Sequence, residues 1–139
     1  MKCGFETVLA GQRVLQFFYL RVDDFDVAPA VFTNKMIVVG VGGGSVMDAA
    51  KAAAWLAANR VEDTARLFAG TLRRPPLPLV LVGTTAGTGS EMSNALVVTE
   101  GSTGRKLAVL ADPAVSEYAV LNADLMLTLP AKMTIACGL

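Results

Sequence analysis

Residues 36–45 of this chain read MIVVGVGGGS, and this stretch decides the fold. An uninterrupted apolar run, residues 36–41, lies between the polar pair Asn34-Lys35 and three glycines, which is typical of a strand buried on both faces of a parallel sheet. The alanine-rich residues 46–59 contain no proline and predict a helix, with Ser45 as its cap. The stretch therefore predicts a strand, a glycine turn and a helix in direct succession.

The chain that follows repeats this pattern. Residues 62–68 predict a short helix, residues 73–78 (RRPPLP) break regular structure, and residues 79–82 (LVLV) predict a second short buried strand. Two buried strands joined through helices imply a right-handed crossover and a parallel α/β sheet. Before the first strand, residues 6–32 show only a weak helical periodicity.

The last part of the chain predicts a hairpin, a strand and a helix. Residues 95–99 and 106–111 are apolar runs around a glycine-containing turn, which favours a β-hairpin. Residues 118–122 predict one more strand, and Pro130 suits the first turn of a final helix, with Thr128 as its cap.

Composition and charge narrow the class of protein. A length of 139 residues suits one domain, since domains commonly run ~100 to 200 residues. The chain is 53% hydrophobic and 17% charged, against a usual ~45–50% and ~25%, so it has ample material for a core. Twelve acidic and twelve basic residues cancel, so no overall field attracts nucleic acid or an anionic membrane surface.

The chain has no run of ~20 apolar residues that could span a bilayer. Cys3 and Cys137 stand far apart and make no metal-spaced pattern, so we expect a cytoplasmic protein without a disulfide scaffold. Histidine, the commonest metal ligand and acid/base near neutral pH, is absent.

The glycine turn is the first chemical signal. A glycine-rich passage from a buried strand into a helix exposes backbone N–H groups at the positive end of the helix dipole, where phosphate fits, and Ser45 adds a hydroxyl. A tight turn that binds nothing is an equally open interpretation. Asp48 and Lys51 follow on one side of the helix; they form either an exposed ion pair or, for Asp48, a group within reach of a ligand.

The second signal is a loop rich in hydroxyls. Residues 84–91 (TTAGTGSE) follow the strand at residues 79–82, at the edge where open α/β sheets bind ligands. Hydroxyl and backbone donors suit a pyrophosphate, a ribose or a carboxamide, whereas Glu91 is the only general base in the loop. A solvated loop without a ligand is the alternative.

Together the two motifs resemble the paired signatures of the iron-containing, group III alcohol dehydrogenases. Residues 42–51 (GGGSVMDAAK) match the first signature and residues 84–91 match the second, in the expected order. The similarity continues, most closely to the lactaldehyde reductase and propanediol oxidoreductase branch, at Lys106, residues 122–126 (NADLM) and residues 134–138 (TIACG).

This resemblance implies NAD or NADP as cofactor. The contacts that it implies are Gly43, Gly44 and Ser45 at the pyrophosphate, Asp48 toward the nicotinamide, Thr84, Thr85 and Thr88 at phosphate or nicotinamide ribose, Ser93 as a further lining residue and Lys106 at the ribose.

The resemblance also implies a fold class: an α/β, parallel-sheet, Rossmann-like nucleotide-binding domain with a β-hairpin, lacking the family's all-helical metal domain. Residues 35–139 would form a partial dinucleotide-binding domain, preceded by a poorly assignable segment at residues 1–34. Family members hold Fe(II) or Zn with an Asp-xxx-His pair just beyond the position of residue 139 and with two later histidines, so this chain contains none of those ligands.

The function implied is hydride transfer between a primary alcohol or diol and NAD(P), with the metal polarising the alcohol oxygen. The partners would be small alcohols or aldehydes, and a homo-oligomer is compatible with the family. Without metal ligands we expect residues 1–139 alone to be inactive. The alternatives are a non-catalytic, truncated nucleotide-binding module, or an inactive gene remnant whose uncovered sheet edge favours aggregation.

Overall fold

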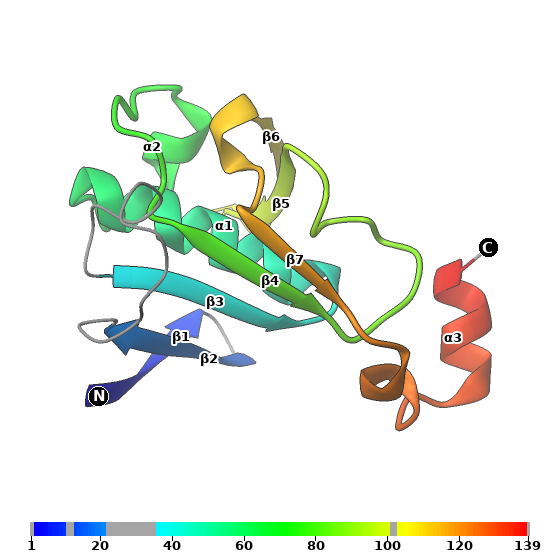
Figure 1. The fold of residues 1–139 in the computed structure, drawn as a ribbon. Coiled ribbons are helices and arrows are strands. Elements are labelled where there is room, and N and C mark those ends of the chain that lie inside the picture. The colour runs from blue at the N-terminus through cyan, green and yellow to red at the C-terminus, as the bar shows by residue number, and fades with distance from the viewer. Residues whose placement is uncertain (1, 11–12, 22–35, 101–102, 139) are drawn as a thin grey trace.

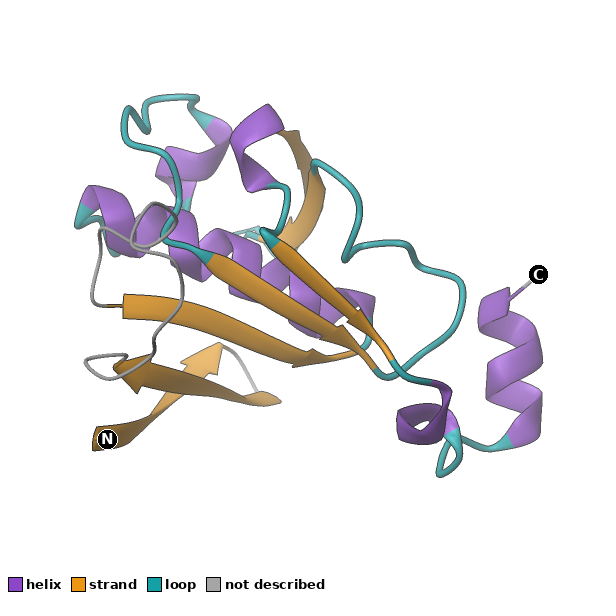
Figure 2. Cartoon of the chain, viewed as in Figure 1, coloured by secondary structure: helices purple, strands orange, loops and turns teal. Residues whose placement is uncertain are grey.

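A computed structural model of the chain describes residues 2–10, 13–21, 36–100 and 103–138. Figures 1 and 2 show a mixed main sheet with helices on it and a separate hairpin. The main sheet has the order β1 (Lys2–Ala10), β2 (Arg13–Arg21), β3 (Met36–Gly42), β4 (Leu79–Gly83) and β7 (Tyr118–Leu121). β3, β4 and β7 run parallel, whereas β1, β2 and β3 are joined antiparallel.

The described residues also form a hairpin of β5 (Ala95–Thr99) and β6 (Lys106–Leu110). The α-helices among them are α1 (Gly44–Asn59), α2 (Ala65–Phe68) and α3 (Ala131–Gly138). Two short 3-10 helices, η1 (Asp112–Ala114) and η2 (Ala123–Met126), complete the described elements. β5 and β6 pair antiparallel, with Ala95 opposite Leu110 and Thr99 opposite Lys106.

Helix α1 is the centre of the molecule, because it packs on both sides. One face lies on β3 and β4 in a core cluster of Val38, Met47, Ala50, Ala54, Leu77, Leu79 and Leu81. Its other face packs against α2, the hairpin and η1 in a second cluster of Ala52, Trp55, Leu56, Leu67, Leu96 and Ala114. The alanine-rich sequence of α1 follows from this position, since small side chains allow two layers to approach one helix.

Gly40 allows the closest approach between α1 and the sheet. A Cβ atom at Gly40 would lie 2.7 Å from the Cβ of Ala50 and 2.8 Å from Cδ2 of Leu81. Since real Cβ atoms do not approach other heavy atoms this closely, any side chain at this position would push α1 away from β3. The position of the helix start relative to the strand ends therefore depends on this glycine.

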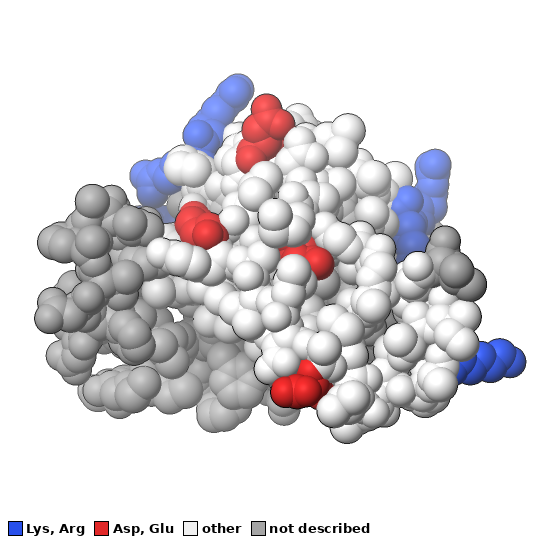
Figure 3. Space-filling view, turned by 45° about the vertical axis from the view of Figure 1, so that its right-hand side comes forward, with Lys and Arg blue, Asp and Glu red and all other residues white. Residues whose placement is uncertain are grey.

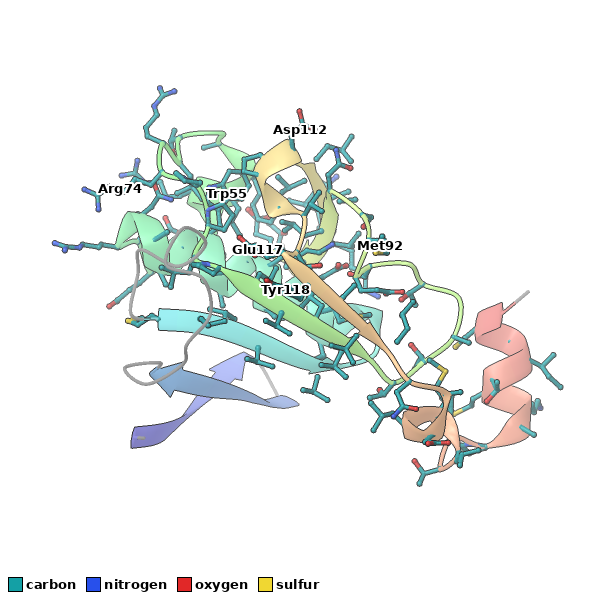
Figure 4. All side chains as sticks on the ribbon, viewed as in Figure 1. Trp55, Arg74, Met92, Asp112, Glu117 and Tyr118 are labelled. Atoms are coloured by element: carbon teal, nitrogen blue, oxygen red, sulfur yellow. The ribbon has the colours of Figure 1, made fainter. Side chains whose placement is uncertain are left out.

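The far end of α1 is anchored by hydrogen bonds to the segment that leads into β4. The side chain of Asn59 accepts from the amides of Arg73 and Arg74, at 3.0 and 2.9 Å, and donates to the Arg74 carbonyl. The indole of Trp55 donates to the same carbonyl at 3.0 Å, and Figure 4 shows it beside this segment. These bonds satisfy backbone groups in a proline-rich stretch that cannot pair within regular structure.

Most of the predicted elements are confirmed. The predicted strands at residues 36–41, 79–82 and 118–122, the hairpin and the last helix are all present, and β3 and β4 are parallel as expected. The short helix is confirmed only for Ala65–Phe68.

Two predictions of secondary structure are wrong, and one prediction of burial holds only in part. The described part of residues 6–32 forms strands of an antiparallel hairpin that pairs with β3, because pairing with a neighbouring strand overrides a weak helical period; residues 22–35 lie outside the described residues. Ser45 is not the helix cap, since α1 begins at Gly44 with Gly43 as its N-cap. The strand at residues 36–41 is also less enclosed than predicted, since Val41 is 46% exposed.

No helix in the described residues is long and apolar enough to cross a membrane. Figure 3 shows one face of the molecule as mostly uncharged, with acidic side chains scattered over it and lysines and arginines at its rim. Several large apolar side chains near the carboxyl end are exposed, including Leu121, Leu127 and Ile135.

The packing of α1 on the sheet generates a stability prediction. Leu81 is 0% exposed beneath α1, so Leu81→Ala should lower the free energy of unfolding by about 2–5 kcal/mol through lost burial and a residual cavity. Leu127 is 78% exposed, and Leu127→Ala should change it by less than about 0.5 kcal/mol. Urea unfolding followed by the fluorescence of Trp55, the single tryptophan, measures both. Equal losses in the two variants would contradict the assigned core.

Candidate functional site

The glycine turn presents free backbone donors at the start of α1. β3 ends at Gly42, and Gly43 is extended with φ −78° and ψ −179°. The Gly43 carbonyl accepts from the amides of Val46 and Met47 at 3.0 and 3.1 Å. Within the described residues the amides of Gly44 and Ser45 have no hydrogen-bond partner, as expected for the first turn of a helix. These two donors, together with the helix dipole, favour an anionic ligand.

The threonine loop, defined as residues 84–94, lies directly against this turn. The Thr84 amide donates to the Gly42 carbonyl at 2.9 Å, continuing the parallel pairing of β3 and β4. A Cβ atom at Gly43 would lie 3.2 Å from Cγ2 of Thr85, and one at Gly44 would lie 3.0 Å from Cγ2 of Thr88. The two motifs singled out in the sequence therefore meet at one edge of the sheet, and we call their joint surface, residues 42–45 and 84–88, the cradle.

The Thr85 hydroxyl lacks a partner. Its Oγ1 atom is buried and makes no hydrogen bond among the described residues. A buried hydroxyl without a partner costs about 1–3 kcal/mol. Since Oγ1 would lie 3.3 Å from a Cβ at Gly43, this unmet donor is next to the open amides of the turn. The donor set of the cradle thus fits a phosphate, which offers several acceptors at once.

Gly87 sets the path of the threonine loop. Its φ of +109° is a backbone conformation that other residues rarely adopt, and a Cβ there would lie 1.6 Å from the Cys137 carbonyl oxygen. Helix α3 has no buried residues, so this contact with the loop is a close approach of backbone rather than side-chain packing. The carboxyl end of α3 is therefore beside the cradle, as Figure 1 also shows.

Asp48 and Lys51 do not form an exposed ion pair, so that interpretation is wrong. The Lys51 side chain is 0% exposed, and its Nζ donates to the carbonyls of Ser93 and Ala95 at 2.9 and 2.8 Å. Asp48 Oδ1, 3.8 Å from Nζ, accepts from the Ser90 hydroxyl, and Oδ2 accepts from the Val97 amide at 3.0 Å. The two charged side chains join α1 to the threonine loop and to β5.

Burial lowers the pKa of Lys51, because desolvation penalises the charged ammonium group. The carboxylates of Asp48 and Glu91 oppose this shift by stabilising the charge, but the effect of burial is larger.

The structure places the remaining predicted site residues, Ser45, Ser93 and Lys106, at three separate positions. Ser45 is exposed in the first turn of α1. The Ser93 hydroxyl is 3.3 Å from both Lys51 Nζ and the Ala95 carbonyl, so it belongs to the internal network. Lys106 is exposed at the start of β6, and its ribose contact stays a prediction.

Sequence reasoning missed Ser90, which is 6% exposed, and the burial of Lys51. A usable signal was present: Asp48 and Lys51 are the only charged residues of a helix made otherwise of alanine and other apolar or small residues. Because such a helix has no polar face, its two charged side chains are expected to contact other parts of the protein. No group of three or more His, Cys, Asp or Glu side chains that could hold a metal ion occurs among the described residues.

Comparison with known proteins gives consistent matches. The family described as iron-containing alcohol dehydrogenase matches residues 27–123. A curated relative, "Probable alcohol dehydrogenase EutG" of Salmonella typhimurium, is 39% identical over 73% of this chain and 26% of its own length. The NAD-dependent methanol dehydrogenase of Bacillus methanolicus is 36% identical over 76% of this chain and 28% of its own length.

Solved structures agree with the sequence matches. A sulfoacetaldehyde reductase from Bifidobacterium kashiwanohense, crystallised in complex with NAD+, is similar with a TM-score of 0.61 and 33% identity over 71% of this chain and 27% of that one. The chain therefore spans about a quarter of the length of these relatives.

The buried lysine generates a pH prediction. A pKa lowered in the folded state means that, between this pKa and the ordinary lysine value of ~10.4, the unfolded chain binds more protons. The contribution of Lys51 to stability should therefore rise with pH through this window and be smallest below it. Urea unfolding of the wild type and of Lys51→Met, from about pH 7 to about pH 10, measures the difference. A difference that stays flat or falls with pH would refute the prediction.

Proposed function

The chain belongs to the iron-containing alcohol dehydrogenase family, and from that membership we propose that it is the NAD(P)-binding part of an enzyme that transfers hydride between a small alcohol and the cofactor. The reaction would interconvert a primary alcohol or diol and its aldehyde. Support for the small substrate comes from the relatives, which include a methanol dehydrogenase and a sulfoacetaldehyde reductase. We also propose a cytoplasmic location.

One observation carries the proposal: the open amides at the start of α1 and the threonine loop form a single cradle. We propose that the amides of Gly44 and Ser45 bind the pyrophosphate of the cofactor, and that Gly43, by having no side chain, lets Thr85 lie close to these amides. Thr85, whose buried hydroxyl lacks a partner, and Thr88 would donate from the opposite side. A dinucleotide's diphosphate offers the several acceptors that this set of donors needs.

The other site residues have different roles in this proposal. Thr84 would contribute its side chain at the strand end, while its amide is already engaged with Gly42. Lys106 would contact the ribose. Asp48 and Ser93, which the family resemblance also implies as cofactor contacts, have their side chains bonded within the protein.

In the proposed reaction, the residues of this chain would bind the cofactor and orient it. The nicotinamide cofactor, when bound, supplies or accepts the hydride. Helix α1 and the threonine loop would fix the diphosphate at the ends of β3 and β4, and this fixes where the rest of the cofactor can reach. The loop contains no histidine, and its single carboxylate is Glu91. We therefore expect the threonine loop to provide donors and positioning rather than several acid/base groups.

The metal would be held elsewhere in a longer enzyme. The family name implies iron, and zinc is the alternative that we propose for the same position. A divalent ion would polarise the alcohol oxygen. The described residues offer no cluster of three metal-ligating side chains, so they do not fit the ion. This observation also favours a second candidate function for residues 1–139 alone: a nucleotide-binding module without turnover.

The cradle generates a binding prediction. Gly44→Val would place its Cβ against Thr88 and its methyl groups over the open amides, so the Kd for NADH should rise about tenfold or more. Ala57→Val also introduces a valine into α1, but at an exposed position near the other end of the helix, and should leave the Kd unchanged. Titration of each protein with NADH, followed by nucleotide fluorescence, measures the Kd. Unmeasurable binding by the wild type would refute the proposed function.

The absence of metal ligands in the described residues generates an activity prediction. Residues 1–139 alone, supplied with NAD+, propanediol and Fe(II) or Zn(II), should produce NADH no faster than a protein-free blank. Absorbance of NADH measures the rate, with a full-length family member assayed in parallel as the positive control. Metal-dependent turnover by these residues would show that the chain holds the ion after all.

A further inference from the structure

The threonine loop touches α1 at two levels. At the helix start, Thr88 lies against Gly44, and one turn further along, the Ser90 hydroxyl donates to Oδ1 of Asp48. Gly89, with φ +62°, connects the two contacts on the loop side. On the helix side, Gly44 and Asp48 are one turn of α1 apart. The four residues therefore close a ring in which the distance from Gly44 to Thr88 depends on the bond between Asp48 and Ser90.

Ser90 differs from the other hydroxyls of the loop. Thr88 is exposed, whereas Ser90 is 6% exposed and its hydroxyl points to Asp48. A buried side chain whose donor is already used has no group left for a ligand. Its contribution to the cradle can only be indirect.

Asp48 is held in turn by its own partners. Its second oxygen accepts from the Val97 amide, and the Lys51 ammonium lies 3.8 Å from its first oxygen. Lys51 also holds the carbonyls of Ser93 and Ala95, at the end of the loop. One turn of α1 thus fixes both the middle and the end of the loop through charge-assisted hydrogen bonds, which are stronger than neutral ones.

Resting on the proposed function, we propose that Ser90 is a positioning residue for the cofactor cradle: through Asp48 it holds Thr85 and Thr88 at the start of α1. Asp48 and Ser93 then act inside the protein as part of this anchor, instead of touching the cofactor as the family resemblance implied. The anchor is needed because the loop contains glycines at positions 87 and 89 and no regular secondary structure of its own.

Ser90→Ala tests the role of the hydroxyl while removing a single atom. The hydrogen exchange of amides in residues 84–94 should accelerate, and the Kd for NADH should rise about tenfold, because a misplaced donor set binds less well. Lys51→Met should have the same two effects through the end of the loop. If Lys51→Met fails to fold, Ser90→Ala decides the question by itself.

Asn59→Ala is the matched control for lost stability. Asn59 anchors the opposite end of α1 and has no contact with the threonine loop among its hydrogen bonds. This variant should lower the melting temperature while the Kd of the folded fraction and the exchange of residues 84–94 stay at wild-type values. A merely structural role for Ser90 would give the same result as Asn59→Ala.

The outcomes separate the two proposals. Changes below twofold in both exchange and Kd for Ser90→Ala, or equal changes in Asn59→Ala, would overturn the positioning role. Faster exchange in Ser90→Ala together with no NADH binding even by the wild type would support the anchor and refute the proposed function.

Discussion

The contact between α1 and the sheet is the constraint on which the rest of the structure depends. Because Gly40 has no side chain, Ala50 and Leu81 can occupy the space beside it, and the helix lies close on β3 and β4. This closeness brings the first turn of α1 to the ends of both strands. The open amides, the Thr85 hydroxyl and the Thr88 side chain then lie side by side. If α1 lay farther from the sheet, the glycine turn and the threonine loop would no longer touch.

The second side of α1 explains the charged pair in an apolar helix. The hairpin and η1 cover this side, so Asp48 and Lys51 are enclosed where the loop passes into β5. Burying two charges is costly unless their hydrogen bonds are satisfied, and here carbonyls, an amide and a serine hydroxyl satisfy them. The same bonds specify where the loop lies, so the network contributes to position as well as to stability.

Parts of the main sheet and of the carboxyl-terminal segment are exposed. A parallel sheet is usually covered on both faces, but Val41 and Val120 are exposed on the described part of this one, and α3 and η2 bury no residue. The chain spans about a quarter of its relatives' length. The family was predicted correctly from two motifs, GGGSVMDAAK and TTAGTGSE, because each combines residues with a specific physical task at a strand end.

The sequence by itself determined the elements from residue 36 onward and the meeting of the glycine turn with the threonine loop, since apolar runs, glycine turns and parallel crossovers are local or follow simple topological rules. Only the tertiary structure decided the strand pairing of the chain before residue 22, the burial of Lys51 and the hydrogen bond of Ser90 to Asp48. The last two depend on contacts between residues that are 42 positions apart in the sequence, as in the Ser90–Asp48 and Lys51–Ser93 bonds. Local sequence patterns do not reveal such partners. An aspartate that contacts solvent and one that bonds to a distant serine can stand in the same local sequence.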